Sequence, residues 1–117
     1  MNAPDATREI SIRDAPERGR YEASIPGAED VAAAYYRLRN GTIVFTHTEV
    51  PPAFSGRGVG KALARFALDD AARRGLQVIP RCPFMASVVR RYAEYHRLVP
   101  DEIRAELGLA ADDRAGG

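Results

Sequence analysis

The sequence predicts a mixed α+β (α/β) domain in which an antiparallel-dominated sheet is flanked by helices. Three observations predict this class. Residues before position 51 fall into β-branched and alternating segments separated by Gly and Pro, which is typical of strands. Helical spacing of apolar residues begins only at Val59. Between these two parts, a Gly-rich turn connects a strand to a helix and a further strand candidate follows, so the two flanking strands should run parallel.

The first half of the chain is expected to form four antiparallel strands. Residues 16–19 supply the turn of the first hairpin. Asn40-Gly41 supplies the second turn, because this dipeptide accepts the positive φ angles of a two-residue hairpin. Pro51 and Pro52 then end the last strand, since neither can donate a ladder hydrogen bond. The predicted strands span residues 8–13, 20–25, 31–39 and 42–50.

The second half is expected to contain three helices and one short strand. Apolar residues from Val59 to Ala71 recur with helical spacing, and Gly75 stands where a C-terminal cap belongs. The first helix should therefore span residues 59–74. The remaining predicted elements are a buried strand at residues 76–80 and helices at residues 84–92 and 101–109.

Length and composition indicate one hydrophobic core. The chain has 117 residues, of which 45% are apolar and 28% are charged, as in ordinary globular domains. We expect a single domain over residues 7–110, with disordered ends at residues 1–6 and 111–117, which are small and polar. Cys82 is the only cysteine, so no internal disulfide can form. No metal is expected, because His47 and His96 lack the spacing and partners of a ligand set.

Charge and hydropathy exclude several kinds of partner. The formal net charge of +1 predicts no long-range attraction to nucleic acid or to an anionic membrane. No segment approaches the roughly 18 apolar residues that span a bilayer, and the first residues lack the basic and apolar regions of a secretory leader. The expected location is therefore cytoplasmic, and the expected assembly is a monomer or a weak homodimer.

Residues 55–61 form a Gly-rich turn in front of the first predicted helix. Its glycines allow positive φ angles and close approach of a ligand, while backbone N–H groups and the helix dipole converge on an anion. Arg57 and Lys61 add charge-assisted contacts to phosphate oxygens. Taken alone, such a turn is equally typical of a plain strand-to-helix connection. A Walker-type loop is excluded because no Gly-Lys-Ser/Thr ending is present, and the acidic residue of a dinucleotide site is also missing.

Three segments in order carry a resemblance to a known family. Residues 57–63 resemble the acyl-CoA pyrophosphate signature of the Gcn5-related N-acetyltransferase (GNAT) superfamily. Together with residues 47–52 and 79–84, they resemble a small, truncated branch whose members are described as N-acetyltransferase-like. The resemblance covers roughly residues 20–99. Residues 92–95 depart from it, because they read Tyr-Ala-Glu-Tyr where the branch often carries His-Pro-Glu-Tyr.

The resemblance implies a truncated acyl-CoA N-acyltransferase fold with a splayed central strand pair. The strands ending near Val50 and Pro80 separate, and the pantetheine arm of acetyl-CoA or CoA lies between them. The implied activity is acetyl transfer to an unidentified amine, in a branch that lacks the helices that usually help to build the acceptor site. The implied cofactor-binding residues are Thr48, Val50, Ser55, Gly56, Arg57, Gly58, Val59, Gly60, Lys61, Arg81 and Tyr92.

Three residues are candidates for the chemistry of transfer. Cys82 precedes a predicted helix near the anion site, and it is either a thiol that accepts the acetyl group or a small buried apolar side chain. His47 and Glu49 alternate along one strand, so both project from the same face, where either can take a proton from an attacking ammonium. Their alternative roles are a structural histidine and a surface ion pair. Tyr92 either contacts the coenzyme or packs in the core.

Two functions therefore stay open from the sequence. The first is an acetyltransferase that acts directly or through Cys82. The second is a non-catalytic module that binds or senses CoA or acetyl-CoA, since the truncated acceptor side removes parts that an efficient enzyme needs.

Overall fold

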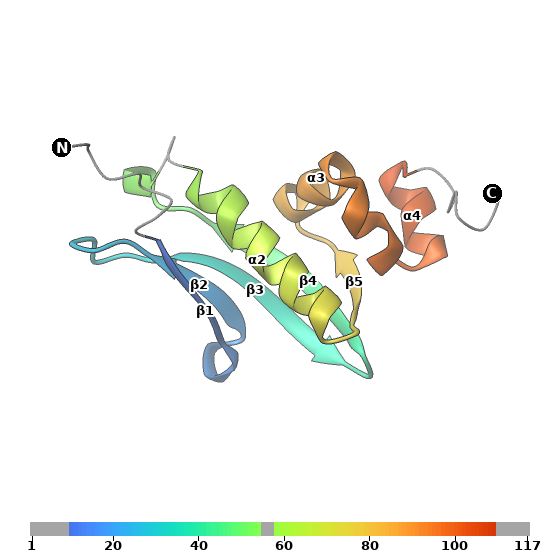
Figure 1. Cartoon of the computed structure of the whole chain (residues 1–117), viewed down its shortest axis with the longest axis horizontal. Coiled ribbons are helices and arrows are strands. Elements are labelled where there is room, and N and C mark those ends of the chain that lie inside the picture. Colours follow the sequence, from blue (N-terminus) through green and yellow to red (C-terminus); the bar gives the residue numbers. More distant parts are fainter. Residues whose placement is uncertain (1–9, 55–57, 110–117) are drawn as a thin grey trace.

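A computed structural model of the chain describes residues 10–54 and 58–109 and confirms the mixed α+β fold (Figure 1). Five strands form one sheet in the order β1-β2-β3-β4-β5. The first four pair antiparallel, and β5 runs parallel to β4, as the order of elements predicts. The strands are β1 (Ser11–Ala15), β2 (Arg20–Ser24), β3 (Ala32–Arg39), β4 (Thr42–Glu49) and β5 (Gln77–Pro80). The helices are α2 (Val59–Arg73), α3 (Pro83–Arg91) and α4 (Asp101–Leu107), with 3-10 turns η1 (Pro16–Arg18), η2 (Pro52–Phe54) and η3 (Ala93–Leu98).

Most element boundaries agree with the sequence-based expectation to within one residue, and the larger differences lie in β1, in the segment after α3 and in α4. Strand β1 reaches Ala15 because Pro16 opens η1, whereas the predicted strand ended at residue 13. Residues 93–98 form η3, which the sequence analysis did not predict. Helix α4 ends before Gly108, whose φ of 75° makes it a left-handed cap. Residues 8 and 9, and the expected disordered ends at residues 1–6 and 111–117, lie outside the described residues.

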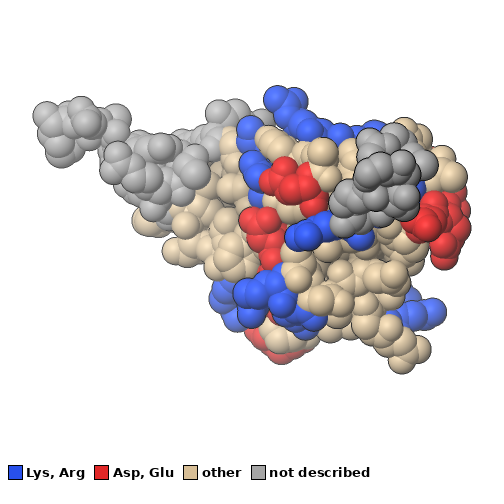
Figure 2. All heavy atoms as spheres, turned by 45° about the vertical axis from the view of Figure 1, so that its right-hand side comes forward, with Lys and Arg blue, Asp and Glu red and all other residues tan. Residues whose placement is uncertain are grey.

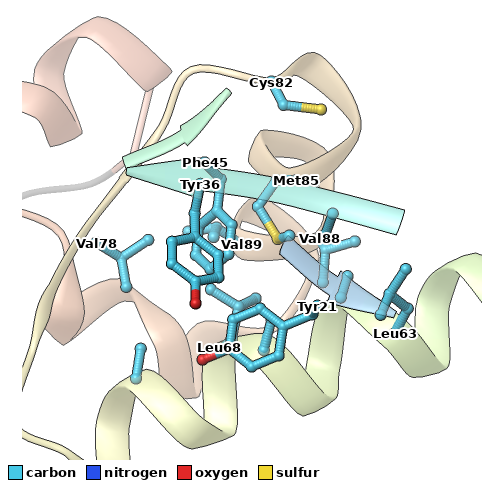
Figure 3. Packing of buried hydrophobic residues seen from close by; sticks show 14 of the residues in the cluster. Tyr21, Tyr36, Phe45, Leu63, Leu68, Val78, Cys82, Met85, Val88 and Val89 are labelled. Atoms are coloured by element: carbon cyan, nitrogen blue, oxygen red, sulfur yellow. The ribbon is translucent and has the colours of Figure 1, made fainter. Parts of the chain in front are cut away.

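Helix α2 lies diagonally across one face of the sheet (Figure 1). Its inward stripe has helical spacing and consists of Val59, Leu63, Ala64, Ala67, Leu68 and Ala71, all of which are buried. Tyr21 and Phe45 meet this stripe from the sheet, and Met85 and Val89 join the same cluster from α3 (Figure 3). We call the face of the sheet that α2 covers the helix side, and the opposite face the outer face.

A β-bulge in β4 decides which side chains reach each face. Phe45 pairs with Tyr36, but His47 pairs with the preceding residue Tyr35, so Thr46 is an extra residue in β4. Before the bulge, Phe45 points to the helix side. After it the alternation is inverted, because Thr48 pairs with a helix-side alanine of β3 and the two residues that flank Thr48 face outward. One inserted residue therefore turns Thr48 inward and His47 outward.

The C-terminal elements continue the helical layer beside β5. Helix α3 packs against α2 and against the ends of β4 and β5. Arg104 of α4 is 6% exposed, and its Nε donates to the carbonyl oxygens of His96 and Val99 at 3.0 and 3.1 Å. Because this guanidinium satisfies backbone carbonyls of η3, α4 is fixed to the preceding turn. The described helices include none long and apolar enough to cross a bilayer.

Candidate functional site

The central feature of the site is the place where β4 and β5 stop pairing. Their register runs from Thr42↔Gln77 to Phe45↔Pro80. The N–H groups of Arg81 and Cys82 then both donate to the carbonyl oxygen of Phe45, at 2.9 and 3.0 Å, and the chain turns into α3. Strand β4 continues to Glu49, so in the described part of the chain no strand pairs with the β5 side of residues 46–49. The predicted separation of the two strands thus begins after Phe45 and leaves an open strand edge.

Gly60 lies where three elements converge at this opening. A Cβ atom at Gly60 would stand 3.2 Å from Cζ of Phe84 in α3 and 3.2 Å from Cγ2 of Val50 after β4. Gly60 has helical rather than positive φ, so the expected use of its backbone freedom is wrong, and its small size is what the site requires. Val50 and Phe84 are each 38% exposed, and we call the apolar surface that these two side chains form at the opening the entrance.

The N-terminus of α2 faces this entrance. Gly58 adopts a φ of 73° at the N-cap, which confirms the predicted need for glycine there. The first intrahelical bond after it runs from the N–H of Ala62 to the carbonyl oxygen of Gly58, at 3.0 Å. The N–H groups of Val59, Gly60 and Lys61 precede that bond and remain available to an anion, as at the start of any helix. Ser55, Gly56 and Arg57 lie outside the described residues.

A basic and aromatic cluster continues from the same helix end. The guanidinium carbon of Arg65 stands 4.1 Å from the ring centroid of Tyr92, next to α3. Desolvation raises the pKa of the Tyr92 phenol, but the hydrogen bond and charge of Lys61, together with Arg91, lower it below the ordinary value. The structure therefore brings together Lys61 and Tyr92, which the sequence analysis had assigned to the coenzyme from segments 31 positions apart. Arg65 was missed, because its position in the helix resembles that of any solvated arginine.

Cys82 lies on the helix side of the strand opening. It is 4% exposed and serves as the N-cap of α3. Its Sγ is 3.2 Å from Oγ1 of Thr48. Figure 3 places Cys82 at the margin of the buried cluster, apart from Tyr21 and Tyr36. Thr48 and Cys82 are thus neighbours only because the bulge turns Thr48 inward.

His47 and Glu49 lie on the outer face. Nε2 of His47 is 3.2 Å from Oε2 of Glu49, and both side chains are about three-fifths exposed, at 61% and 59%. The imidazole stacks on Tyr35 with ring centroids 6.0 Å apart, and the Tyr35 hydroxyl accepts a hydrogen bond from Arg20 at 2.9 Å. The predicted common face of His47 and Glu49 is confirmed. It is, however, the face opposite to Cys82, so the three catalytic candidates do not form one cluster.

Arg81 contributes to a hollow on the outer face. This outer hollow has a volume of about 540 Å³, and its lining includes Arg37 and Arg39 of β3, Val44 and Thr46 of β4, Ile79 of β5 and Arg81. Nη1 of Arg81 is also 3.2 Å from Oε1 of Glu106. Arg37 and Arg39 were not predicted as site residues, since alternating arginines on a strand are typical of a solvated face.

These features define a class of protein. A bulged strand that separates from its parallel neighbour beside a glycine-led helix is consistent with a GNAT-like acyltransferase fold. The family model described as GCN5-related N-acetyl-transferase matches residues 20–98, and the chain belongs to this family. Among the described residues, no group of three or more His, Cys, Asp or Glu side chains is placed to hold a metal ion.

Curated relatives carry the same type of domain. The protein named NATD1 from Xenopus tropicalis is 29% identical over 91 residues, which are 77% of this chain and 84% of the relative. NATD1 from Bos taurus is 32% identical over 89 residues, covering 75% and 79% of the two chains. NATD1 from Mus musculus is 32% identical over 82 residues, covering 69% and 74%. The similarity extends over most of both chains, so it concerns the whole domain.

Proposed function

We propose that this protein binds acetyl-CoA and transfers its acetyl group to an amine. The observation that carries the proposal is the open edge of β4 at residues 46–49, which ends beside the N-terminus of α2. The pantetheine arm of coenzyme A carries amide groups, which can pair with a free strand edge as an added strand does. The pyrophosphate that follows the arm then meets the first N–H groups of α2, where the helix dipole favours negative charge.

The residues around this path fit the parts of the coenzyme. Val50 and Phe84 offer apolar contact to the arm, and Gly60 lets both side chains approach the first turn of α2 closely. Lys61 adds positive charge near the phosphates, and Tyr92 adds an aromatic surface. Ser55, Gly56 and Arg57 remain predicted phosphate contacts at the same helix end. Backbone N–H groups of β4 near the bulge are the proposed donors to the thioester carbonyl oxygen, whose negative charge grows during attack.

The transfer needs a neutral amine. The amine nitrogen attacks the carbonyl carbon of the thioester, a C–N bond forms, the C–S bond breaks, and the coenzyme leaves as a thiolate that takes up a proton. His47 and Glu49 lie on the outer face beside the bulge, so either can accept the proton that the ammonium loses. In this direct route, the coenzyme occupies the helix side and the amine approaches from the outer face.

Cys82 offers a second route. Its sulfur exchanges with the coenzyme sulfur at the acetyl carbon, and the amine then attacks the thioester on Cys82. The direct route is the one we propose, because Cys82 is buried against Thr48 on the helix side while the proton acceptors lie on the outer face.

A binding module without turnover is the second candidate function. This function is favoured by the distance between the catalytic candidates, because Cys82 lies on the helix side of β4 while His47 and Glu49 lie on its outer face. Such a module keeps the coenzyme site and lacks productive access for an amine.

Calorimetric titration with acetyl-CoA and CoA tests the proposal, with thiol release measured in the same samples after an amine is added. Lys61→Gln should weaken binding about tenfold, the size of one charge-assisted contact. Arg73→Gln is the matched control, because Arg73 is an exposed cation near the other end of α2. Release of the CoA thiol would support the acetyltransferase, whereas binding of acetyl-CoA without release would support the binding module. No binding of either ligand to the wild type would refute both.

A further inference from the structure

The outer hollow is positively charged at its rim and apolar at its floor. Arg37 and Arg39 project from the same face of β3 because they are two positions apart. Val44 of β4 lies between Arg37 and Ile79 in the strand ladder, so Val44 and Ile79 form the floor beside the arginines. Among the described residues that line the hollow, none is acidic.

Two of these arginines have their charge available. In the described part of the chain, neither Arg37 nor Arg39 forms an ion pair. Arg81 has one exposed partner, Glu106, in an ion pair whose two side chains are both more than half exposed. Such a pair contributes little stability and exchanges readily for another anion. On the surface in Figure 2, by contrast, acidic and basic side chains lie next to one another.

The hollow ends at the strand opening. Its lining runs along β4 from Thr42 to Thr46, and Thr46 is the bulge residue directly before His47. Arg81 lies at the same end, since its N–H bonds to Phe45 where the pairing stops. A strand rises about 3.3 Å per residue, so the row that contains Arg37 and Val44 lies on the order of 10 Å from His47. An anion held at the arginines can therefore belong to the same molecule as an amine at the opening.

We propose that the acceptor is an amine that also carries a carboxylate or phosphate group, which the outer hollow binds through Arg37, Arg39 and Arg81. This inference rests on the proposed acetyl transfer. Guanidinium groups bind both kinds of anionic oxygen through paired N–H donors. The same charges disfavour acceptors that carry only positive charge, such as polyamines.

Matched amines test the inference. 4-Aminobutyrate and O-phosphoethanolamine are compared with butylamine and ethanolamine as acceptors, by thiol release from acetyl-CoA. At least one amine that carries an anionic group should have a kcat/KM about tenfold above that of its counterpart without one, and which amine shows the preference tells carboxylate from phosphate. The double variant Arg37→Gln/Arg39→Gln should lose the preference but keep the rate with butylamine and the affinity for acetyl-CoA. Equal use of the amines that lack an anionic group, or a preference that survives the double variant, would overturn the inference while leaving acetyl transfer intact.

A binding measurement separates failure of the inference from failure of the proposed function. If no amine is acetylated although acetyl-CoA binds, the transfer proposal fails. Binding of an anion in the outer hollow can still be measured directly. The amide resonances of Val44 and Ile79 should then shift when O-phosphoethanolamine or 4-aminobutyrate is added to the wild type, and not in the double variant. The control Arg73→Gln should behave as the wild type. No shift with either probe overturns the anion site.

Discussion

The two ends of helix α2 are held in opposite ways. At its C-terminal end, Asp70 accepts a hydrogen bond from the Tyr21 hydroxyl at 2.6 Å and pairs with Arg73 and Arg74. At its N-terminal end, Gly60 stands between side chains of two other elements and no acidic residue occupies the first turn. The first end is closed by paired charges, whereas the second is open in the sense that its first N–H groups have no acceptor within the helix.

The closed end contributes to the stability of the domain, and the other end is where we propose that the coenzyme binds. The closed end extends to a second buried hydroxyl, since Tyr36 donates to Asp14 at 2.5 Å and Arg74 lies 3.6 Å from the same carboxylate. Desolvation and the bond to Asp14 raise the pKa of Tyr36 above its ordinary value, so the phenol stays neutral and donates. Because one end of α2 is anchored in this way, the other end can stay open to a ligand while the helix remains folded.

The largest effect on acetyl-CoA affinity is expected from adding a side chain at Gly60, in the first turn of α2. Gly60→Leu places a side chain between Val50 and Phe84, and it should weaken acetyl-CoA binding about 100-fold, equivalent to about 2.7 kcal/mol, as measured by calorimetry. The fold should survive, since leucine has the higher helix propensity and Val50 and Phe84 are partly exposed. Arg73→Leu, at the closed end, is the control and should bind normally. Unchanged affinity in Gly60→Leu would show that the coenzyme does not pass this point.

Removing the shared acceptor at the closed end should lower the stability of the protein and leave its affinity for acetyl-CoA unchanged. Asp70→Ala leaves the Tyr21 hydroxyl and two arginines without their shared acceptor, and it should lower the free energy of unfolding by about 2 kcal/mol in urea titrations. Affinity for acetyl-CoA, measured well below the unfolding transition, should not change. Asp30→Ala, an exposed loop position, serves as the control. A loss of affinity in Asp70→Ala would mean that the two ends are coupled.

The pH dependence of the free energy of unfolding tests the role of Asp70 at the closed end. Desolvation raises the pKa of Asp70, but the hydrogen bonds from Tyr21, Arg73 and Arg74 outweigh it, and the pKa is lowered in the folded protein. The stabilisation is therefore present above the unfolded-state pKa of about 3.9 and is lost as the pH falls through the lower folded-state pKa. Between pH 6 and pH 3, the wild type should lose on the order of 1 kcal/mol more than Asp70→Ala. Parallel losses in the two proteins would contradict this account.

The smallest effect is expected at Cys82, which lies near the open end. Under the direct route, Cys82→Ser should change the rate of acetyl transfer by no more than about threefold, because the thiol takes no part in the bonds that form and break. The serine hydroxyl can replace the contact with Oγ1 of Thr48. Loss of transfer with unchanged acetyl-CoA affinity would instead establish the route through Cys82.

Several local features could be predicted from short segments. Asn40 and Gly41 adopt φ angles of 48° and 79°, as the predicted hairpin turn requires. Gly58 and Gly75, both at positive φ, flank the helix that apolar spacing had indicated. The parallel arrangement of β4 and β5 predicted only that Cys82 lies near the Gly-rich turn, and the contact between Thr48 and Cys82 was not predicted.

The strands, the α-helices, their order and the family resemblance could be predicted from the sequence alone, because periodicity, turn residues and a compact motif act over a few neighbouring positions. Only the tertiary structure decided which faces the functional candidates occupy. Thr46 carries no local signal for a bulge, and its insertion depends on how β4 pairs with Tyr35 and Tyr36 of another strand. The roles of Gly60 and Arg37 likewise depend on neighbours distant in sequence, since the close contacts of Gly60 with Val50 and Phe84 and the hollow beside Arg37 exist only after the chain has packed.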